Sequence, residues 1–128
     1  MKLGSLVMSV AASVEGTVFV DFQGMLGNSE LELLAGEAHG FVEATGVRCV
    51  VANIQKVADV TTAEKRVSVL SRIAAESNLE KRPRVVIVGR CAGGCGPCEA
   101  TYKPLAENAG LVVDCASTPS AARALVGL

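Results

Sequence analysis

The sequence predicts an α/β domain in which helices cover a mixed sheet of five strands. Of its 128 residues, 50% are hydrophobic, which is enough for one packed core. Short runs of β-branched residues alternate with longer stretches in which apolar residues recur at helical spacing. Aromatic residues make up only 3% of the chain, a composition that favours close packing of helices on a sheet. The expected order is β-β-α-β-α-β-α-β-α, within a single domain spanning residues 1–128.

The chain is expected to begin with an antiparallel pair of strands followed by a helix. Leu3–Val10 and Thr17–Phe22 have strand-like patterns, and Glu15-Gly16 between them suits a hairpin turn. Ser29 and Glu32 have the spacing of a capping box, which marks the start of a helix. The apolar residues of that helix share one face: Leu31, Leu34, Ala35, Ala38, Phe41 and Val42.

The middle of the chain is expected to form a β-α-β unit. The apolar run Cys49–Ile54 is typical of a buried strand. Thr61 and Glu64 repeat the capping-box spacing, so a second helix should begin there. Val85–Val88 is the most apolar β-branched run and should form a central strand. The apolar face of the second helix is expected to contain Ala63, Val67, Leu70, Ile73 and Ala74.

The last part of the chain should add two helices and one strand. A third helix is expected to follow a loop rich in cysteine and glycine and to end at Gly110. Leu111–Val113 is the last expected strand. Thr118 and Pro119 have the N-cap and first-position pattern of a short terminal helix, whose residues Ala121, Ala122, Leu125 and Val126 turn inward. Because β-α-β crossovers are right-handed, the last three strands should be parallel.

Charge and hydropathy exclude several classes of protein. Twelve Lys and Arg residues against thirteen Asp and Glu residues give a formal net charge of -1, so no surface for nucleic acid is indicated. The longest apolar stretch, Leu6–Val14, is far shorter than the roughly 20 residues of a membrane helix. Five cysteines, three of them crowded together, do not resemble a secreted disulfide framework. We therefore expect a cytoplasmic protein without membrane insertion.

The order of an antiparallel pair followed by three β-α units resembles the STAS domain of sulfate transporters and anti-sigma factor antagonists, including small STAS-like bacterial proteins. The similarity spans nearly the whole chain. Its best local stretch runs from Gly46–Ile54 through Val60–Ala63, which looks like the family's strand, short loop and hydroxyl residue at the start of a helix. The resemblance implies a regulatory domain that acts by binding a partner protein.

The same resemblance makes Thr61 and Thr62 candidate regulatory residues. In the family this loop typically reads Asp-Ser-Ser-Gly, and a partner kinase phosphorylates the serine. Thr61 stands where the family has Asp, Thr62 stands where it has the serine, and Glu64 stands at a usually small or apolar position. A phosphoryl group on Thr62 would be stabilised by the helix dipole and by the free N–H groups of the first turn. The two threonines also have a purely structural interpretation, as a helix cap.

Thiol chemistry is a second hypothesis, and it concerns the loop Arg90–Cys98 that leads from a strand into a helix. Its segment Cys-Gly-Pro-Cys is identical to the active-site motif of thioredoxins, a resemblance that implies a redox-active dithiol. A helix N-terminus lowers the pKa of a thiol, so Cys95 would attack a disulfide and Cys98 would resolve it. Thioredoxins have an aromatic residue where this chain has Gly94, and they need a later hairpin with a cis-proline.

A metal site is the alternative use of the same loop. Cys91, Cys95 and Cys98 are close in sequence, and Cys115 is expected at the end of a parallel strand that emerges at the same sheet edge. Four thiolates at one edge would suit zinc or an iron–sulfur cluster. Cys49 begins its strand and should lie at the opposite end as a buried apolar residue.

The sequence favours a binding module over an enzyme. With one histidine, His39, the chain offers no Ser-His-Asp arrangement. Our leading hypothesis is a small STAS-like regulatory domain without a cofactor, which binds a protein partner and carries a redox- or metal-sensitive cysteine loop. The rival hypothesis is a thioredoxin-like thiol-disulfide oxidoreductase that uses Cys95 and Cys98. The identity of the partner and the oligomeric state do not follow from the sequence.

Overall fold

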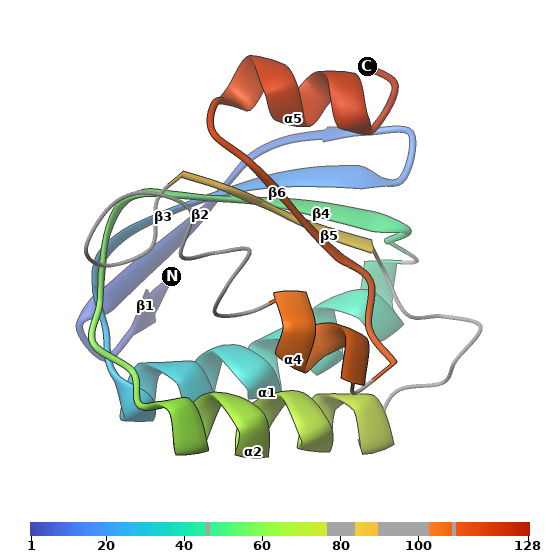
Figure 1. Ribbon diagram of the computed structural model, residues 1–128. Coiled ribbons are helices and arrows are strands. Elements are labelled where there is room, and N and C mark those ends of the chain that lie inside the picture. The colour runs from blue at the N-terminus through green and yellow to red at the C-terminus, as the bar shows by residue number, and fades with distance from the viewer. Residues whose placement is uncertain (46, 77–83, 90–102, 109) are drawn as a thin grey trace.

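One six-stranded sheet runs through the described part of the chain, with helices on both of its faces (Figure 1). The structure, a computed structural model, describes residues 1–45, 47–76, 84–89, 103–108 and 110–128. The strands are β1 (Lys2–Leu3), β2 (Leu6–Val14), β3 (Thr17–Leu26), β4 (Cys49–Asp59), β5 (Arg84–Val88) and β6 (Val113–Ala116). The helices described are α1 (Asn28–Thr45), α2 (Ala63–Glu76), α4 (Lys103–Asn108) and α5 (Pro119–Leu125).

The sheet is mixed, as predicted, and its strands follow the order of the sequence. β1, β2 and β3 are antiparallel neighbours, whereas β3, β4, β5 and β6 are parallel neighbours. The predicted hairpin is confirmed, because Val14 pairs with Thr17 around Glu15 and Gly16. Glu15 and Gly16 have φ values of 49° and 83°, the positive values that a type I′ turn requires.

The sheet has six strands rather than the five predicted, because the first expected strand is divided at Gly4. The φ of Gly4 is 62°, so the chain reverses there and Leu3 pairs with Leu6 in a tight hairpin. The run Val85–Val88 is part of β5, and its residues Val86 and Val88 are 0% and 1% exposed. β5 is the fifth strand in order, between β4 and β6, and not the centre of the sheet.

The last strand begins two residues later than predicted, because the end of α4 occupies Leu111. The N–H of Leu111 donates to the carbonyl of Ala106 at 2.8 Å, and the N–H of Gly110 donates to Glu107 at 3.0 Å. Gly110 has a φ of 80°, which completes a Schellman motif. The predicted helix end at Gly110 is thus confirmed, and the strand expected at Leu111–Val113 is corrected to β6.

Both predicted capping boxes are displaced. α1 is capped by Gly27 and not by Ser29: the N–H of Leu31 donates to the carbonyl of Gly27 at 3.0 Å, and Glu30 accepts the N–H of Gly27 at 3.0 Å. Glu30 also accepts the N–H of Ser5 at 3.1 Å, which ties the β1–β2 turn to the start of α1. The prediction of a capping box at Ser29 and Glu32 was wrong. Local sequence spacing carries no information about the contact of Glu30 with Ser5, which is distant in the chain.

Two apolar clusters lie on opposite faces of the sheet. The cluster under α1 and α2 comprises Leu3, Leu6, Val18, Val20, Phe22, Leu26, Leu31, Ala35, Val47 and Val69. The cluster that includes α5 comprises Cys49, Val51, Val86, Val88, Ala116 and Ala122. Among the described helices, α5 covers this face in Figure 1, and Arg84 fastens it there by donating to the carbonyl of Leu125 at 3.0 Å and to Asp114 at 2.8 Å.

The inward faces of α2 and α5 differ in part from the predicted ones. Val69 of α2 is 1% exposed, whereas Val67, expected inside, is 44% exposed. The face of α2 that packs inward is therefore the one that contains Val69. Lys65 and Arg72 lie along the same face and pair with Glu32 of α1. In α5 the predicted Thr118 cap is confirmed, since Thr118 accepts the N–H of Ala121 at 3.1 Å. Of the four residues predicted to turn inward from this helix, Ala122 is buried and Val126 is half-buried, whereas Ala121 and Leu125 are exposed.

Replacing Glu30 with Gln is expected to lower stability at neutral pH and to weaken its dependence on acid. The N–H of Ser5, with that of Gly27, lowers the pKa of the Glu30 carboxyl below its usual value near 4.5. The carboxylate therefore stabilises the fold above that value, and this contribution is lost as the pH falls through the lower pKa of the folded state. Urea unfolding of both proteins should show a difference at neutral pH that shrinks in acid. A difference that stays constant with pH would contradict this role.

Candidate functional site

The starts of α1 and α2 meet at one end of the sheet, where β3 and β4 end side by side. Leu26, the last residue of β3, pairs with Asp59, the last residue of β4. The pairing continues one residue further, because the N–H of Val60 donates to the carbonyl of Leu26 at 2.9 Å. Asn28 and Thr62 follow directly after these paired ends. The register of two parallel strands therefore brings the first residue of α1 against the residue that precedes α2.

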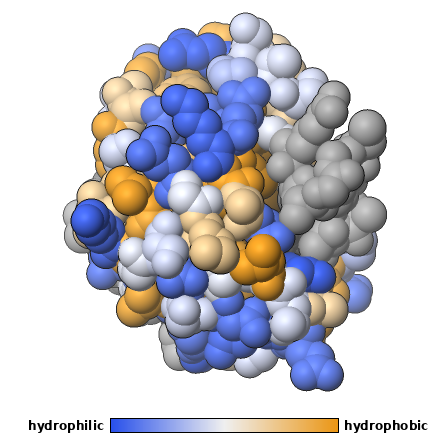
Figure 2. Space-filling model, turned by 90° about the vertical axis from the view of Figure 1, so that its left-hand side faces the viewer, coloured by the Kyte–Doolittle hydropathy of each residue, from blue (hydrophilic) through white to orange (hydrophobic). Residues whose placement is uncertain are grey.

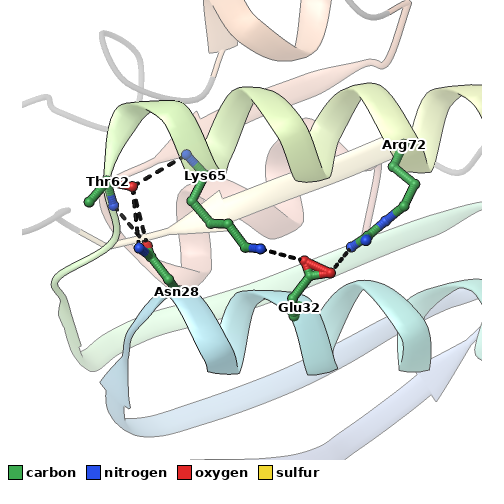
Figure 3. A network of polar contacts seen from close by, with 5 residues as sticks. All are labelled: Asn28, Glu32, Thr62, Lys65 and Arg72. Atoms are coloured by element: carbon green, nitrogen blue, oxygen red, sulfur yellow. Dashed lines mark hydrogen bonds and ion pairs between the residues drawn. The ribbon is translucent and has the colours of Figure 1, made fainter.

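Thr62 is the N-cap of α2 and is held by Asn28 (Figure 3). The N–H of Lys65 donates to Thr62 Oγ1 at 3.3 Å, which is the bond expected of an N-cap hydroxyl. Asn28 contacts both the main chain and the side chain of Thr62: its Oδ1 accepts the Thr62 N–H at 3.0 Å, and its Nδ2 donates to Thr62 Oγ1 at 3.3 Å. The Thr62 side chain is nevertheless exposed. Its hydroxyl is thus fixed in position and open to solvent.

Thr61 has a different role from its neighbour. Its hydroxyl donates to Asp59 Oδ1 at 2.6 Å, and its N–H donates to the same oxygen at 3.0 Å. Arg66 Nη1 donates to the carbonyl of Thr61 at 2.8 Å and to its Oγ1 at 2.9 Å. Thr61 is half-buried in these contacts. The capping residue of α2 is therefore Thr62, and the predicted box of Thr61 with Glu64 is wrong.

An ion-pair network lies beside Thr62, between α1 and α2 (Figure 3). Glu32 of α1 accepts Lys65 Nζ at 2.8 Å and Arg72 Nη2 at 2.5 Å, both from α2. The hydrogen bonds from Lys65 and Arg72 lower the pKa of the Glu32 carboxyl. One carboxylate is shared by two cations, so the three side chains together carry one excess positive charge. Of the two cations, Lys65 lies within one helical turn of Thr62 in the sequence of α2.

Apolar side chains are exposed at the same end of the molecule. Figure 2 views this end and shows hydrophobic surface in the middle of the face, between hydrophilic groups. Met25, near the end of β3, is 47% exposed, and Val60, two residues before the α2 cap, is 59% exposed. They belong to neighbouring strand ends, because Met25 pairs with Ala58. Val60 is thus an exposed apolar residue two positions before Thr62, and Met25 lies near the end of the neighbouring strand.

The cysteines are separated by the fold as far as they are described. Cys49 pairs with Arg84 at the start of the parallel strands and is buried, and burial raises the pKa of its thiol. Cys115 pairs with Ile87 near the other end of these strands, so the predicted separation of Cys49 from Cys115 is confirmed. The predicted dithiol and metal ligands Cys91, Cys95 and Cys98 lie outside the described residues. In the described ranges, no three His, Cys, Asp or Glu side chains group to hold a metal.

The sequence analysis missed Asn28, Glu32, Lys65 and Arg72 as site residues. Each acts through a partner more than 30 positions away in the chain, and local spacing carries no information about such pairs. One usable signal existed for Asn28, because a polar residue at the end of a strand parallel to Cys49–Asp59 should meet the start of the next helix. Recognising it would have required the correct end of β3, which extends to Leu26 and not to Phe22.

Comparisons with known proteins identify the fold. No family model and no curated protein matches the chain. Among solved structures, the anti-sigma factor antagonist SpoIIAA in its unphosphorylated form is similar with a TM-score of 0.57 and 12% identity, covering 95% of this chain and 100% of that one. The Bacillus cell fate determinant SpoIIAA in its phosphorylated form has a TM-score of 0.53 and 10% identity, covering 93% of this chain and 99% of that one. The predicted STAS-like fold is confirmed.

The length and the apolar character of a helix decide whether it can cross a bilayer. None of the helices in residues 1–45, 47–76, 84–89, 103–108 and 110–128 is long and apolar enough to cross a bilayer.

Replacing Thr62 with Ala is expected to destabilise the protein by about 1 kcal/mol, because Oγ1 no longer accepts from the Lys65 N–H and from Asn28 Nδ2. Thr62→Asp should cost much less, since an aspartate also accepts the N–H groups of a first helical turn. Urea unfolding monitored by circular dichroism measures both variants. Thr118→Ala, which removes the cap of α5, is the matched control and should cost a similar amount. A Thr62→Ala protein as stable as the parent would contradict the capping role.

Proposed function

We propose that this chain is a small cytoplasmic regulatory domain that binds a protein partner, and that phosphorylation of Thr62 controls the binding. The observation that carries the proposal is the exposed Thr62 hydroxyl at the start of α2, in a fold similar to that of SpoIIAA. SpoIIAA is known in an unphosphorylated and a phosphorylated form. The proposal assigns no catalytic turnover and no cofactor to the STAS-like domain itself.

The accessibility of the two threonines supports Thr62 over Thr61 as the modified residue. A protein kinase must place the acceptor hydroxyl in line with the terminal phosphoryl group of a nucleoside triphosphate. Both hydroxyls are hydrogen-bonded, but Thr61 is half-buried and held by Asp59 and Arg66, whereas Thr62 is exposed and its hydroxyl bonds only to Lys65 and Asn28 among the described contacts. In the transfer, the bond from phosphorus to the diphosphate leaving group breaks, and a bond to Thr62 Oγ1 forms. The hydroxyl proton passes to the kinase base.

The surroundings of Thr62 suit a protein partner. Val60 exposes an apolar side chain two residues before it, Met25 exposes another near the end of the neighbouring strand β3, and contacts of this kind contribute to the core of a protein interface. A phosphoryl group on Thr62 would bring roughly -2 charges next to surface that a partner must desolvate. The cost of burying that charge would weaken the complex unless the partner supplied a basic group. Thr62 is therefore well placed to control binding electrostatically.

We further propose that the cysteine loop confers sensitivity to oxidation or to metal on this domain. Cys115 supports the proposal, because its partner Ile87 lies close to the end of β5, from which the chain continues into the loop. Cys91, Cys95 and Cys98 would act with Cys115 in a zinc or iron–sulfur site, or Cys95 and Cys98 would act as a dithiol. A thioredoxin-like oxidoreductase has less support, since the fold is similar to that of SpoIIAA.

Replacing Thr62 with Glu is expected to change the partner's Kd by more than about twofold, which corresponds to more than roughly 0.5 kcal/mol. Immobilised parent protein captures candidate partners from a lysate of the source cells, and mass spectrometry identifies them. The Kd of each purified partner is then measured by calorimetry for the parent and the variant. Thr118→Glu is the matched control, because Thr118 also caps a helix but lies at the start of α5.

The control separates a site-specific effect from an effect on folding. If Thr62→Glu and Thr118→Glu change Kd equally, or if neither changes it, Thr62 is only a helix cap and the regulatory proposal fails. Circular dichroism of both variants confirms that they remain folded before any Kd is compared.

Alkylation rates test the cysteine proposal. In reduced, metal-free protein near neutral pH we expect Cys95 to react fastest, because a thiol at a helix start has a lowered pKa. Cys49 should react last, because it is buried and its pKa is raised. Mass-spectrometric mapping with iodoacetamide gives the order, and uniformly slow labelling would contradict the reactive loop. Joint protection of Cys91, Cys95, Cys98 and Cys115 that a chelator relieves would favour the metal site over the dithiol.

A further inference from the structure

We propose that Lys65 is the residue that responds to a phosphoryl group on Thr62, by leaving Glu32 and pairing with the phosphate. The inference rests on the proposed function only in taking Thr62 as the modified residue. In the unmodified protein, Lys65 joins α2 to α1 through Glu32 at 2.8 Å. In the modified protein, Arg72 keeps Glu32 while Lys65 neutralises the new charge. Phosphorylation thus removes one of the two ion pairs between these helices.

The charges of the network favour the added anion. Glu32 carries one negative charge, and the two cations around it carry two positive charges. The carboxylate can therefore be satisfied by Arg72 alone. A phosphate at Thr62 carries roughly -1.5 to -2 charges at neutral pH, so it attracts an ammonium group more strongly than a carboxylate does at the same distance.

The position of Lys65 on α2 brings it within reach of Thr62. The backbone N–H of Lys65 already donates to Thr62 Oγ1 at 3.3 Å, and residues three apart share one helical face. The Lys65 side chain is 31% exposed and crosses to α1 in Figure 3, so solvent surrounds its flexible stem. Arg72 is ten residues beyond Thr62, which is about 15 Å along the helix. Only Lys65 of the two cations can reach both anions.

Two other charged groups near Thr62, Arg66 and Asp59, are committed to Thr61. Arg66 donates to the carbonyl and the hydroxyl of Thr61, and Asp59 accepts from Thr61 on the same side. Asn28 Oδ1 accepts the N–H of Thr62 and would face the phosphate oxygens, which also accept hydrogen bonds. The modification therefore weakens the Asn28 contact as well as the Lys65–Glu32 pair. Both weakened contacts involve residues near the start of α1, so phosphorylation would loosen the start of α1 from α2.

A phosphate installed without a kinase tests the role of Lys65. Protein with phosphothreonine encoded at position 62 is titrated, and the ³¹P chemical shift gives the second pKa of the phosphate. A lysine beside the dianion lowers that pKa, so Lys65→Gln should raise it by about half a unit. Arg123→Gln, which removes a cation from α5 on the other face of the sheet, is the matched control and should leave it unchanged. Equal phosphate pKa values in the parent and in Lys65→Gln would overturn the proposal.

Double-mutant cycles test the exchange of partners. The coupling between Lys65 and Glu32 in unfolding experiments, measured with Lys65→Gln and Glu32→Gln, should be present in the unmodified protein and absent in the phosphorylated protein. The coupling between Arg72 and Glu32 should persist in both forms. A Lys65–Glu32 coupling that survives phosphorylation would overturn the proposal.

The two proposals can fail separately. Because the phosphate is encoded, the ³¹P titration does not depend on any kinase or partner. A raised phosphate pKa in Lys65→Gln supports the role of Lys65 even if Thr62→Glu leaves partner binding unchanged, which is the outcome that removes the proposed function. An unchanged phosphate pKa removes the role of Lys65 even if Thr62→Glu alters the partner's Kd.

Discussion

The parallel pairing of β3 with β4 is the constraint from which the candidate site follows. The two strands are in register over most of their length, from Thr17 with Cys49 to Leu26 with Asp59. Parallel neighbours require a crossover, and α1 supplies it on the face that holds the larger apolar cluster. Since both strands end at the same level, the helices that follow them begin side by side. Asn28 and Thr62 meet for that reason, without any local sequence signal linking them.

The helices on the two faces of the sheet are held by different kinds of contact. Under α5, Val86 and Val88 are fully buried, and Arg84 links Asp114 of β6 to the carbonyl of Leu125 at the end of α5. On the other face, α1 and α2 are joined at their starts by polar contacts that solvent can reach. A charge added at Thr62 therefore acts on contacts that are exposed enough to rearrange, while the packed core between sheet and α5 stays unchanged.

The sequence was sufficient to predict the order of elements, the antiparallel start, the parallel strands and the STAS-like fold. The first three depend on hydrophobic periodicity and on crossover handedness, which are local or general properties, whereas the STAS-like fold came from the resemblance of the element order to a known family. The strand β4 was predicted only as far as Ile54, because Gln55 and Lys56 interrupt the apolar pattern although the strand continues beside β3. Glu32 was assigned to a cap because its actual partners, Lys65 and Arg72, lie on another helix. Thr62 was predicted as a candidate from the resemblance to a family. The structure was needed to distinguish its role from that of Thr61.

The central claim is that Thr62 is an exposed hydroxyl that cells modify. Mass spectrometry of the protein isolated from its own cells, with site-resolved mapping of phosphothreonine, tests it most directly. The account predicts phosphate on Thr62 and none on Thr61 or Thr118, because Thr61 is held by Asp59 and Arg66 and Thr118 lies at the start of α5. Phosphate on Thr61 or Thr118, or protein that stays unmodified at Thr62 across growth and starvation, would contradict it.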